Sequence, residues 1–212
     1  MSNKYFPYRL YLVVSESDCK LDILEVVEEA IIGGVDIVQL REKNLSTADF
    51  ILKALQVKAV TDKHNVPLII NDNLDVARRV NAFGIHVGNS DLAPTVIQET
   101  WKDCKSIGYS IEYLDQLQKE EALVADYLGI SPVFSTLTKT NTVVEWGLNG
   151  IRAIRQLSKK PLVAIGGMNL SNVREVILAG ADCIAVVSAI CGADDPRVAA
   201  YNLKSEIINS LL

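Results

Sequence analysis

The segment Ile37-Val38-Gln39-Leu40-Arg41-Glu42-Lys43 decides how the rest of the chain is interpreted. It begins with apolar residues and then alternates, so an extended strand places every second side chain on one face. That face carries Gln39, Arg41 and Lys43, whereas Leu40 and Glu42 point the other way. A glycine-containing turn precedes the segment and a helical pattern follows it, which favours an interior parallel strand of an α/β protein.

The polar face lies at the carboxyl end of this predicted strand. In α/β barrels and doubly wound sheets, ligands bind at that end of the strands. Arg41 and Lys43 there suit an anion such as phosphate. A salt-bridged edge strand with a solvated charge cluster explains the same pattern, and this segment alone leaves both interpretations open.

The composition indicates one globular domain over residues 1–212, since the chain has 212 residues of which 49% are hydrophobic. A formal net charge of -5 argues against a nucleic-acid partner. There is no apolar signal core at the N-terminus and no apolar run long enough to span a bilayer, which predicts a soluble, unexported protein. The 4 cysteines show no metal-ligand spacing, so free thiols in a reducing cytoplasm are expected.

Segments rich in β-branched and aromatic residues alternate with helical patterns along the chain. The predicted strands are 8–14, 37–43, 67–70, 84–88, 106–110, 126–130, 161–165 and 181–187. The predicted helices are 21–32, 46–64, 74–80, one opened by Pro94, 112–125, 146–157 and 196–212. A polar loop at 131–141 is long enough to be functional.

This alternation, with no linker or low-complexity break, predicts a compact (β/α)8 TIM barrel. The strands around Ile107 and Asp182 are the weakest of the eight. A doubly wound open sheet is the alternative, and it requires only that one of these two segments is not a strand.

The unusual polar groups and glycines fall just after predicted strands, and a barrel brings all of them to one mouth. These residues are Gln39, Arg41, Lys43, Asn71, Asp72, Asp91, Ser110, Thr136, Thr138, Lys139, Gly166, Gly167 and Ser188.

Two features of this set indicate a ligand. Asp72 and Asp91 follow neighbouring strands and suit Mg²⁺, which prefers oxygen ligands and keeps waters for a diphosphate; the alternative role for each is a helix N-cap. Gly166-Gly167 and Val187-Ser188 follow the seventh and eighth strands, where barrels often bind phosphate, although glycine there also serves turns. His86 lies within a strand and is expected to be a packed or hydrogen-bonded core histidine.

The motifs resemble, in order and over nearly the whole chain, those of the thiamine phosphate synthase family. They are 38–43 (VQLREK), 70–72 (IND), 86–91 (HVGNSD), 136–139 (TLTK), 165–167 (IGG) and 186–190 (VVSAI). The resemblance implies a barrel that joins 4-amino-5-hydroxymethyl-2-methylpyrimidine diphosphate to a thiazole phosphate, giving thiamine phosphate and pyrophosphate with Mg²⁺. It also implies small-molecule phosphate and diphosphate ligands and a homodimer.

The resemblance assigns a role to each matching position. The pyrimidine diphosphate would be held by Gln39, Leu40, Arg41, Glu42, Lys43, Asn71, Ser110 and Lys139, of which Arg41, Lys43, Ser110 and Lys139 would be catalytic. The thiazole phosphate would be held by Thr136, Leu137, Thr138, Gly167, Val187 and Ser188, and the metal by Asp72 and Asp91. The chain departs from the usual family pattern at Ala93, which separates Asp91-Leu92 from Pro94, and at Ser135, where a proline is common.

Two other functions fit parts of the pattern. A thiazole tautomerase resembles this barrel and keeps the thiazole phosphate site but needs no diphosphate or metal, which Asp72, Asp91 and Lys139 argue against. A phosphate-ligand sensor would share most of these residues without turnover. No Cys, Ser–His pair or activated Lys is evident among the mouth residues as a covalent nucleophile, so the sequence favours departure of pyrophosphate before the new bond forms.

Overall fold

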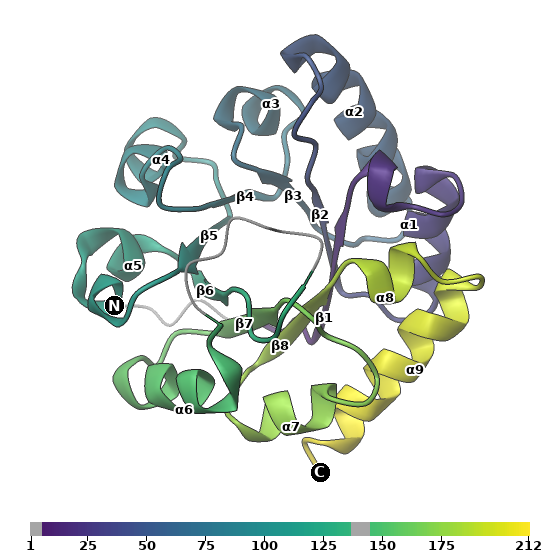
Figure 1. Cartoon of the computed structure of the whole chain (residues 1–212). Coiled ribbons are helices and arrows are strands. Elements are labelled where there is room, and N and C mark those ends of the chain that lie inside the picture. The colour runs from purple at the N-terminus through teal and green to yellow at the C-terminus, as the bar shows by residue number, and fades with distance from the viewer. Residues whose placement is uncertain (1–5, 137–144) are drawn as a thin grey trace.

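The structure is a computed structural model that describes residues 6–136 and 145–212. Parallel strands pair in sequence order and close into a barrel, β1-β2-β3-β4-β5-β6-β7-β8, with β8 pairing back to β1 (Figure 1). The strands are β1 Leu10–Val14, β2 Ile37–Leu40, β3 Leu68–Asn71, β4 Gly84–Val87, β5 Ser106–Ile111, β6 Tyr127–Ile130, β7 Leu162–Ile165 and β8 Cys183–Val186.

Helices surround the barrel, as Figure 1 shows. The α-helices are α1 Ile23–Ile32, α2 Thr47–Lys63, α3 Leu74–Arg79, α4 Pro94–Thr100, α5 Glu120–Val124, α6 Gly147–Leu157, α7 Val173–Leu178, α8 Ser188–Cys191 and α9 Pro196–Asn209. Two 3-10 helices, η1 Glu16–Asp18 and η2 Leu114–Gln118, lie in the connections after β1 and β5. Within the described ranges, none of the helices has the length and apolar character needed to cross a membrane.

The predicted barrel is confirmed, and both weak strands are present as β5 and β8. The alternative prediction of a doubly wound open sheet is therefore wrong. The edge-strand interpretation of the opening segment is also wrong, because β2 pairs with β1 on one side and β3 on the other.

Local differences from the sequence prediction have identifiable causes. β2 ends at Leu40 rather than at residue 43. Residues 112–125 form η2 and α5 rather than one helix, because Lys119 between them is extended and the buried Gln116 side chain accepts from the backbone N–H groups of Glu112 and Tyr113. Helix α7, which is only 6 residues long, was not predicted.

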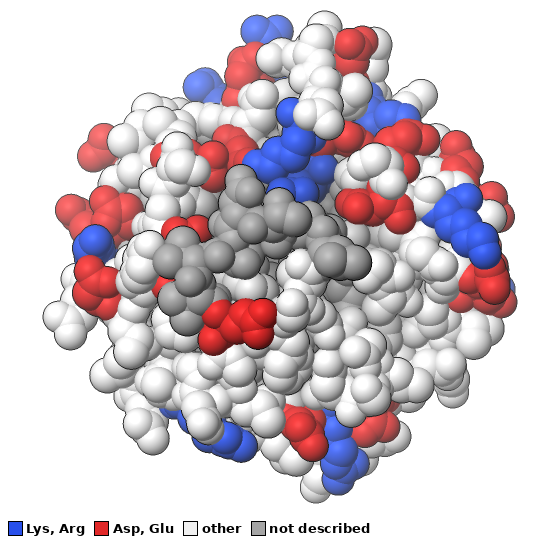
Figure 2. Space-filling model, viewed as in Figure 1, with Lys and Arg blue, Asp and Glu red and all other residues white. Residues whose placement is uncertain are grey.

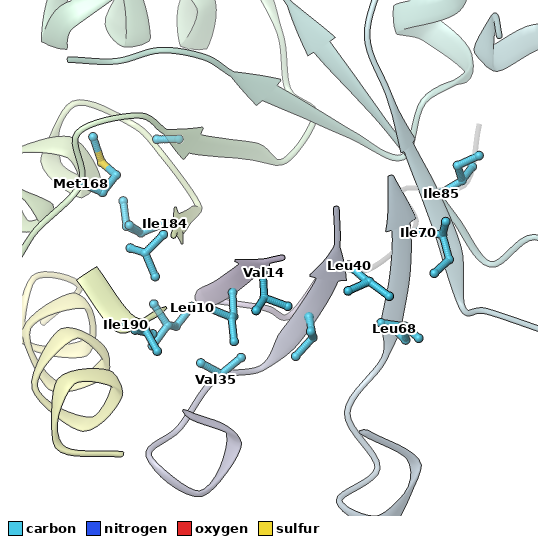
Figure 3. Close-up of a cluster of buried hydrophobic side chains, with 14 of the residues drawn as sticks. Leu10, Val14, Val35, Leu40, Leu68, Ile70, Ile85, Met168, Ile184 and Ile190 are labelled. Carbon is cyan, nitrogen blue, oxygen red and sulfur yellow. The ribbon is translucent and has the colours of Figure 1, made fainter. Parts of the chain in front are cut away.

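Alternation along the strands divides the core into two layers. The outward layer packs the barrel against the helices and includes Leu10, Val14, Leu40 and Ile70, part of which Figure 3 shows. The inward layer is a smaller cluster that includes Tyr11, Ile37, Ile69 and Tyr127. Since side chains alternate along a strand, burying Leu40 outward directs Gln39 inward.

The opposite end of the barrel is held by carboxylates that accept hydrogen bonds from strand N–H groups. Asp36 accepts from the N–H groups of Arg9 and Leu10 at 2.7 and 2.9 Å and is ion-paired with Lys204. Asp126 accepts from Ile107 at 2.8 Å, and Asp182 accepts from Leu162 at 2.8 Å. Each carboxylate precedes one strand and ties down the start of its neighbour, so these groups support stability at the end away from the mouth.

We expect Asp36→Ala to lower the free energy of unfolding by about 2 kcal/mol, because two backbone donors and one ammonium lose their acceptor together. Urea unfolding followed by circular dichroism measures this change. Asp62→Ala is the matched control, because it removes an exposed carboxylate whose partner is Lys58 one helical turn away, and it should leave the midpoint nearly unchanged. Equal midpoints for wild type and Asp36→Ala would contradict the account.

Candidate active site

A cavity of about 520 Å³ opens at the carboxyl end of the strands. Most of the predicted site residues line it, namely Gln39, Arg41, Lys43, Asn71, Asp72, Asp91, Ser110, Thr136, Gly167, Val187 and Ser188. Leu137, Thr138 and Lys139 lie outside the described residues. The barrel thus brings together residues that are up to about 150 positions apart in the sequence, as parallel closure requires.

Two predicted residues of the opening segment do not line the cavity with their side chains. Leu40 is fully buried in the outward layer, so only its backbone can reach a ligand. The Glu42 carboxylate accepts a hydrogen bond from the Glu16 backbone at 2.8 Å and thereby ties the loop after β2 to η1. The predicted alternation is therefore confirmed beyond the end of the strand, with Gln39, Arg41 and Lys43 together on the cavity side.

The β2 side of the mouth carries positive charge. Figure 2 shows Lys and Arg side chains beside the centre of this face, near the start of the connection from β2 to α2, with acidic side chains around them. Lys43 donates to the Asp72 carboxylate at 2.6 Å across to the loop after β3. The Arg41 backbone N–H donates to the Val14 carbonyl at 2.9 Å, which fixes the chain as it leaves the strand.

Asp72 and Asp91 are held by contacts other than helix caps. Asn73 caps α3, and Ala93 precedes α4 without a side-chain cap, so the N-cap alternative is wrong for both aspartates. Asp72 has a φ of 60°, and its N–H donates to the His86 carbonyl at 2.9 Å. The Asp91 carboxylate accepts from the Gly88 N–H at 2.8 Å.

The two carboxylates influence each other electrostatically. Burial raises the pKa of the Asp91 carboxyl above its usual value, and the negative charge of Asp72 raises it further. A partly buried pair of like charges gains most from a cation placed between them. The described residues contain no cluster of three or more His, Cys, Asp or Glu side chains suited to a metal, so a cation at this pair would take its other ligands from water or substrate.

Glycines shape the β7–β8 side of the cavity. Gly166 and Gly167 have φ values of 103° and 68°, a region that favours glycine. A Cβ on Gly167 would lie 2.8 Å from the Ser135 carbonyl oxygen. The glycines therefore satisfy a turn requirement and also let backbone line the same side of the cavity as Val187 and Ser188.

The cavity also contains inward-facing residues that the sequence analysis did not assign to a site, chiefly Tyr11 and Tyr127. His86 is hydrogen-bonded as predicted, to Tyr127 at 3.1 Å, but it also lines the cavity. His86 Nε2 also lies 2.9 Å from Ser110 Oγ, a contact that the sequence analysis did not anticipate. The alternation of side chains along a strand could have identified these residues, because each lies two positions before another residue that lines the cavity.

The chain matches the family model described as thiamine monophosphate synthase over residues 10–190. A thiamine-phosphate synthase of Albidiferax ferrireducens is 47% identical over 200 residues, which cover 94% of this chain and 91% of that protein. One from Vibrio campbellii is 43% identical over 196 residues, covering 92% of this chain and 96% of that protein.

Solved structures agree with these matches. Thiamine phosphate pyrophosphorylase from Pyrococcus furiosus superposes with a TM-score of 0.88 at 34% identity, covering 97% of this chain and 98% of that one. A 3-hexulose-6-phosphate synthase superposes with a TM-score of 0.67 at 20% identity over 93% of this chain and 99% of that one, and shows the shared fold alone. On the family match and these relatives, the chain belongs to the thiamine monophosphate synthase family of enzymes.

Proposed function

We propose that this protein joins 4-amino-5-hydroxymethyl-2-methylpyrimidine diphosphate to thiazole phosphate, forming thiamine phosphate and releasing pyrophosphate. The observation that supports the proposal is that two groups of residues suited to anions line one cavity after different strands. Arg41, Lys43 and the aspartate pair lie after β2 to β4, whereas Gly167 and Ser188 lie after β7 and β8. Two anionic substrates held in one cavity can be aligned for a reaction between them.

The proposed diphosphate site is on the β2–β4 side. Arg41 and Lys43 are cavity-lining cations that suit the diphosphate oxygens, and Lys139 is assigned to the same group by the family resemblance. Asn71, which is 7% exposed, adds an amide at the end of β3. Gln39 and Ser110 lie deeper on their strands and are proposed to meet the pyrimidine ring.

Mg²⁺ is the proposed cofactor, held by Asp72 and Asp91. The pair fits it, because two oxygen ligands leave positions for water and diphosphate oxygens and because the mutual repulsion of the carboxylates favours a cation. When bound, Mg²⁺ would add positive charge to the site of the departing pyrophosphate. Lys43, already 2.6 Å from Asp72, would face the same diphosphate.

The thiazole phosphate is proposed to bind on the β7–β8 side. Thr136, Gly167, Val187 and Ser188 line this part of the cavity, and the resemblance adds Leu137 and Thr138. Uncovered backbone at Gly167 and a hydroxyl at Ser188 are groups that donate hydrogen bonds to phosphate oxygens.

The proposed mechanism is a dissociative substitution. Cationic side chains at the mouth stabilise pyrophosphate as it leaves, and the aminopyrimidine delocalises the positive charge left on its methylene carbon. The thiazole nitrogen, aligned through its phosphate, then forms the carbon–nitrogen bond. No protein base is required, and the cavity contributes alignment and charge stabilisation.

The two other candidate functions find no support among the relatives, which are named as synthases. A tautomerase would leave the aspartate pair and Lys43 without a role. A cytoplasmic location and the lack of a nucleic-acid partner stay predictions of the sequence, and a homodimer stays an expectation from the family resemblance.

Purified protein given both substrates and Mg²⁺ should form thiamine phosphate and pyrophosphate in equal amounts, and EDTA should stop the reaction. In Asp72→Asn and Asp91→Asn, the Mg²⁺ concentration for half-maximal turnover should rise about tenfold or more, because each change removes one charged ligand. Asparagine tolerates the positive φ of residue 72 and can still accept the Gly88 hydrogen bond at residue 91, so both variants should fold.

Asp75→Asn is the matched control for these variants. Asp75 pairs with Arg79 on the exposed side of α3, only three residues from Asp72, and its loss should leave the Mg²⁺ requirement unchanged. Product formation that ignores EDTA, or aspartate variants with wild-type Mg²⁺ demand, would refute the metal assignment. An absence of both products from the wild type would refute the function itself.

The mechanism predicts that a trifluoromethyl group in place of the pyrimidine methyl slows the chemical step at least about tenfold, because it withdraws electrons from the developing cation. Single-turnover rates at saturating concentrations of each pyrimidine diphosphate measure this step. Equal rates for the two pyrimidines would mean that little cation develops, and direct displacement by the thiazole nitrogen would replace the dissociative scheme.

A further inference from the structure

A continuous chain of hydrogen bonds crosses the inside of the barrel below the mouth. Gln39 Nε2 donates to the Tyr11 hydroxyl at 2.9 Å, and the Tyr11 and Tyr127 hydroxyls are 3.0 Å apart. The Tyr127 hydroxyl lies 3.1 Å from His86 Nδ1, and His86 Nε2 lies 2.9 Å from Ser110 Oγ. The chain thus joins Gln39 on β2 to Ser110 on β5, both of which face the cavity.

Burial determines which group donates and which accepts in each of these hydrogen bonds. Tyr11 is 1% exposed and Tyr127 is 0% exposed, so their hydroxyl protons must go to partners within the chain. Because Gln39 donates to Tyr11, the Tyr11 proton goes to Tyr127, and the Tyr127 proton then goes to His86 Nδ1. His86 Nδ1 is consequently an acceptor, and the Nε2–H donates to Ser110.

Glycines on β5 and β6 leave space for the rings of His86 and Tyr127. A Cβ on Gly108 of β5 would lie 2.3 Å from both His86 Nδ1 and the Tyr127 hydroxyl oxygen. A Cβ on Gly129 of β6 would lie 2.9 Å from His86 Cε1. The rings of His86 and Tyr127 stack with centroids 5.5 Å apart. Glycine at both inward positions therefore leaves room for this one arrangement of the pair.

We propose that Tyr11, Tyr127 and His86 are positioning residues that set the donor and acceptor pattern of the cavity. Because its Nε2 donates to Tyr11, Gln39, which lines the cavity, offers its carbonyl oxygen to a ligand as an acceptor. With Ser110 Oγ accepting from His86, the Ser110 hydroxyl donates its proton to a ligand.

This pattern selects a class of heterocycle and rests on the proposed function for its substrate. A 4-aminopyrimidine offers an exocyclic amino donor to Gln39 and a ring nitrogen acceptor to Ser110. A 4-oxopyrimidine reverses both roles, with a carbonyl acceptor and a ring N–H donor. A site whose buried polar groups are left unpaired discriminates strongly against such an analogue.

The same assignment of donors and acceptors explains why the His86–Ser110 contact does not activate Ser110. A histidine whose Nε2 carries the proton cannot remove the Ser110 proton, so the pair does not form an activated nucleophile. Burial raises the pKa of both tyrosine hydroxyls, which keeps them protonated as donors. Ser110 therefore acts as a hydrogen-bond donor, in agreement with a reaction that has no covalent intermediate.

The tautomer of His86 tests the proposal most closely. The chain has 2 histidines, so nitrogen NMR of histidine-labelled protein gives two ring systems, and a His64→Gln variant assigns them. We expect the proton of His86 on Nε2, with Nδ1 unprotonated, and a changed Nδ1 signal in Tyr127→Phe. If the wild type carried the proton on Nδ1, the hydrogen bonds would run in the opposite direction, and the proposal would be overturned.

Ligand discrimination provides a second test that does not depend on turnover. Calorimetry should show that the wild type binds the 4-aminopyrimidine diphosphate more tightly than its 4-oxo analogue, and that Tyr127→Phe reduces this ratio about tenfold. Tyr11→Phe should reduce it in the same direction through Gln39. Tyr109→Phe is the matched control, because it removes the hydroxyl of another buried tyrosine, on β5. That hydroxyl is bonded to Asn89 and Gln116, outside the series of hydrogen bonds from Gln39 to Ser110, so its loss should preserve the ratio.

The outcomes separate the two proposals. An unchanged ratio in both Tyr127→Phe and Tyr11→Phe overturns the positioning role. Normal discrimination in the wild type together with no formation of thiamine phosphate overturns the proposed function while supporting the polarity of the cavity.

Discussion

In a closed barrel of parallel strands, inward side chains of all strands meet in the same interior, and outward side chains must pack under the helices. This alternation is the constraint on which the site depends. Leu40 is buried outward, and as a result Gln39 faces inward and Arg41 and Lys43 continue the same face beyond the end of β2. A shift of one residue in this strand would bury the cations and expose the apolar side chains to the cavity.

Charge at the mouth is arranged so that a ligand relieves unfavourable interactions. The raised pKa of Asp91 reflects burial together with repulsion from Asp72, and Lys43 offsets part of that repulsion. In the proposed complex, a cation and a diphosphate would together complete this pattern, because each would compensate charges that the protein leaves close to one another. Stability is supplied at the other end of the barrel, where Asp36 and Asp182 hold the starts of the strands.

The sequence predicted the barrel and most of the mouth, because the local sequence pattern shows where strands end, as at Asp72 and Gly167. It did not predict that η2 and α5 are separate, since that break depends on where the Gln116 side chain finds its partners. The inner tyrosines were overlooked for a similar reason. Tyr11 and Tyr127 are 116 residues apart, and they are typical strand residues until the closed barrel brings their hydroxyls into contact.

The central claim is that one barrel mouth holds pyrophosphate and a metal after β2 to β4, separately from the phosphate group bound after β7 and β8. The most direct measurement is a crystal structure with thiamine phosphate, pyrophosphate and Mg²⁺ bound. The account predicts the metal between Asp72 and Asp91 in contact with pyrophosphate, and the phosphate ester of thiamine phosphate against Gly167 and Ser188. Pyrophosphate on the Gly167–Ser188 side, or a metal that contacts neither aspartate, would contradict it.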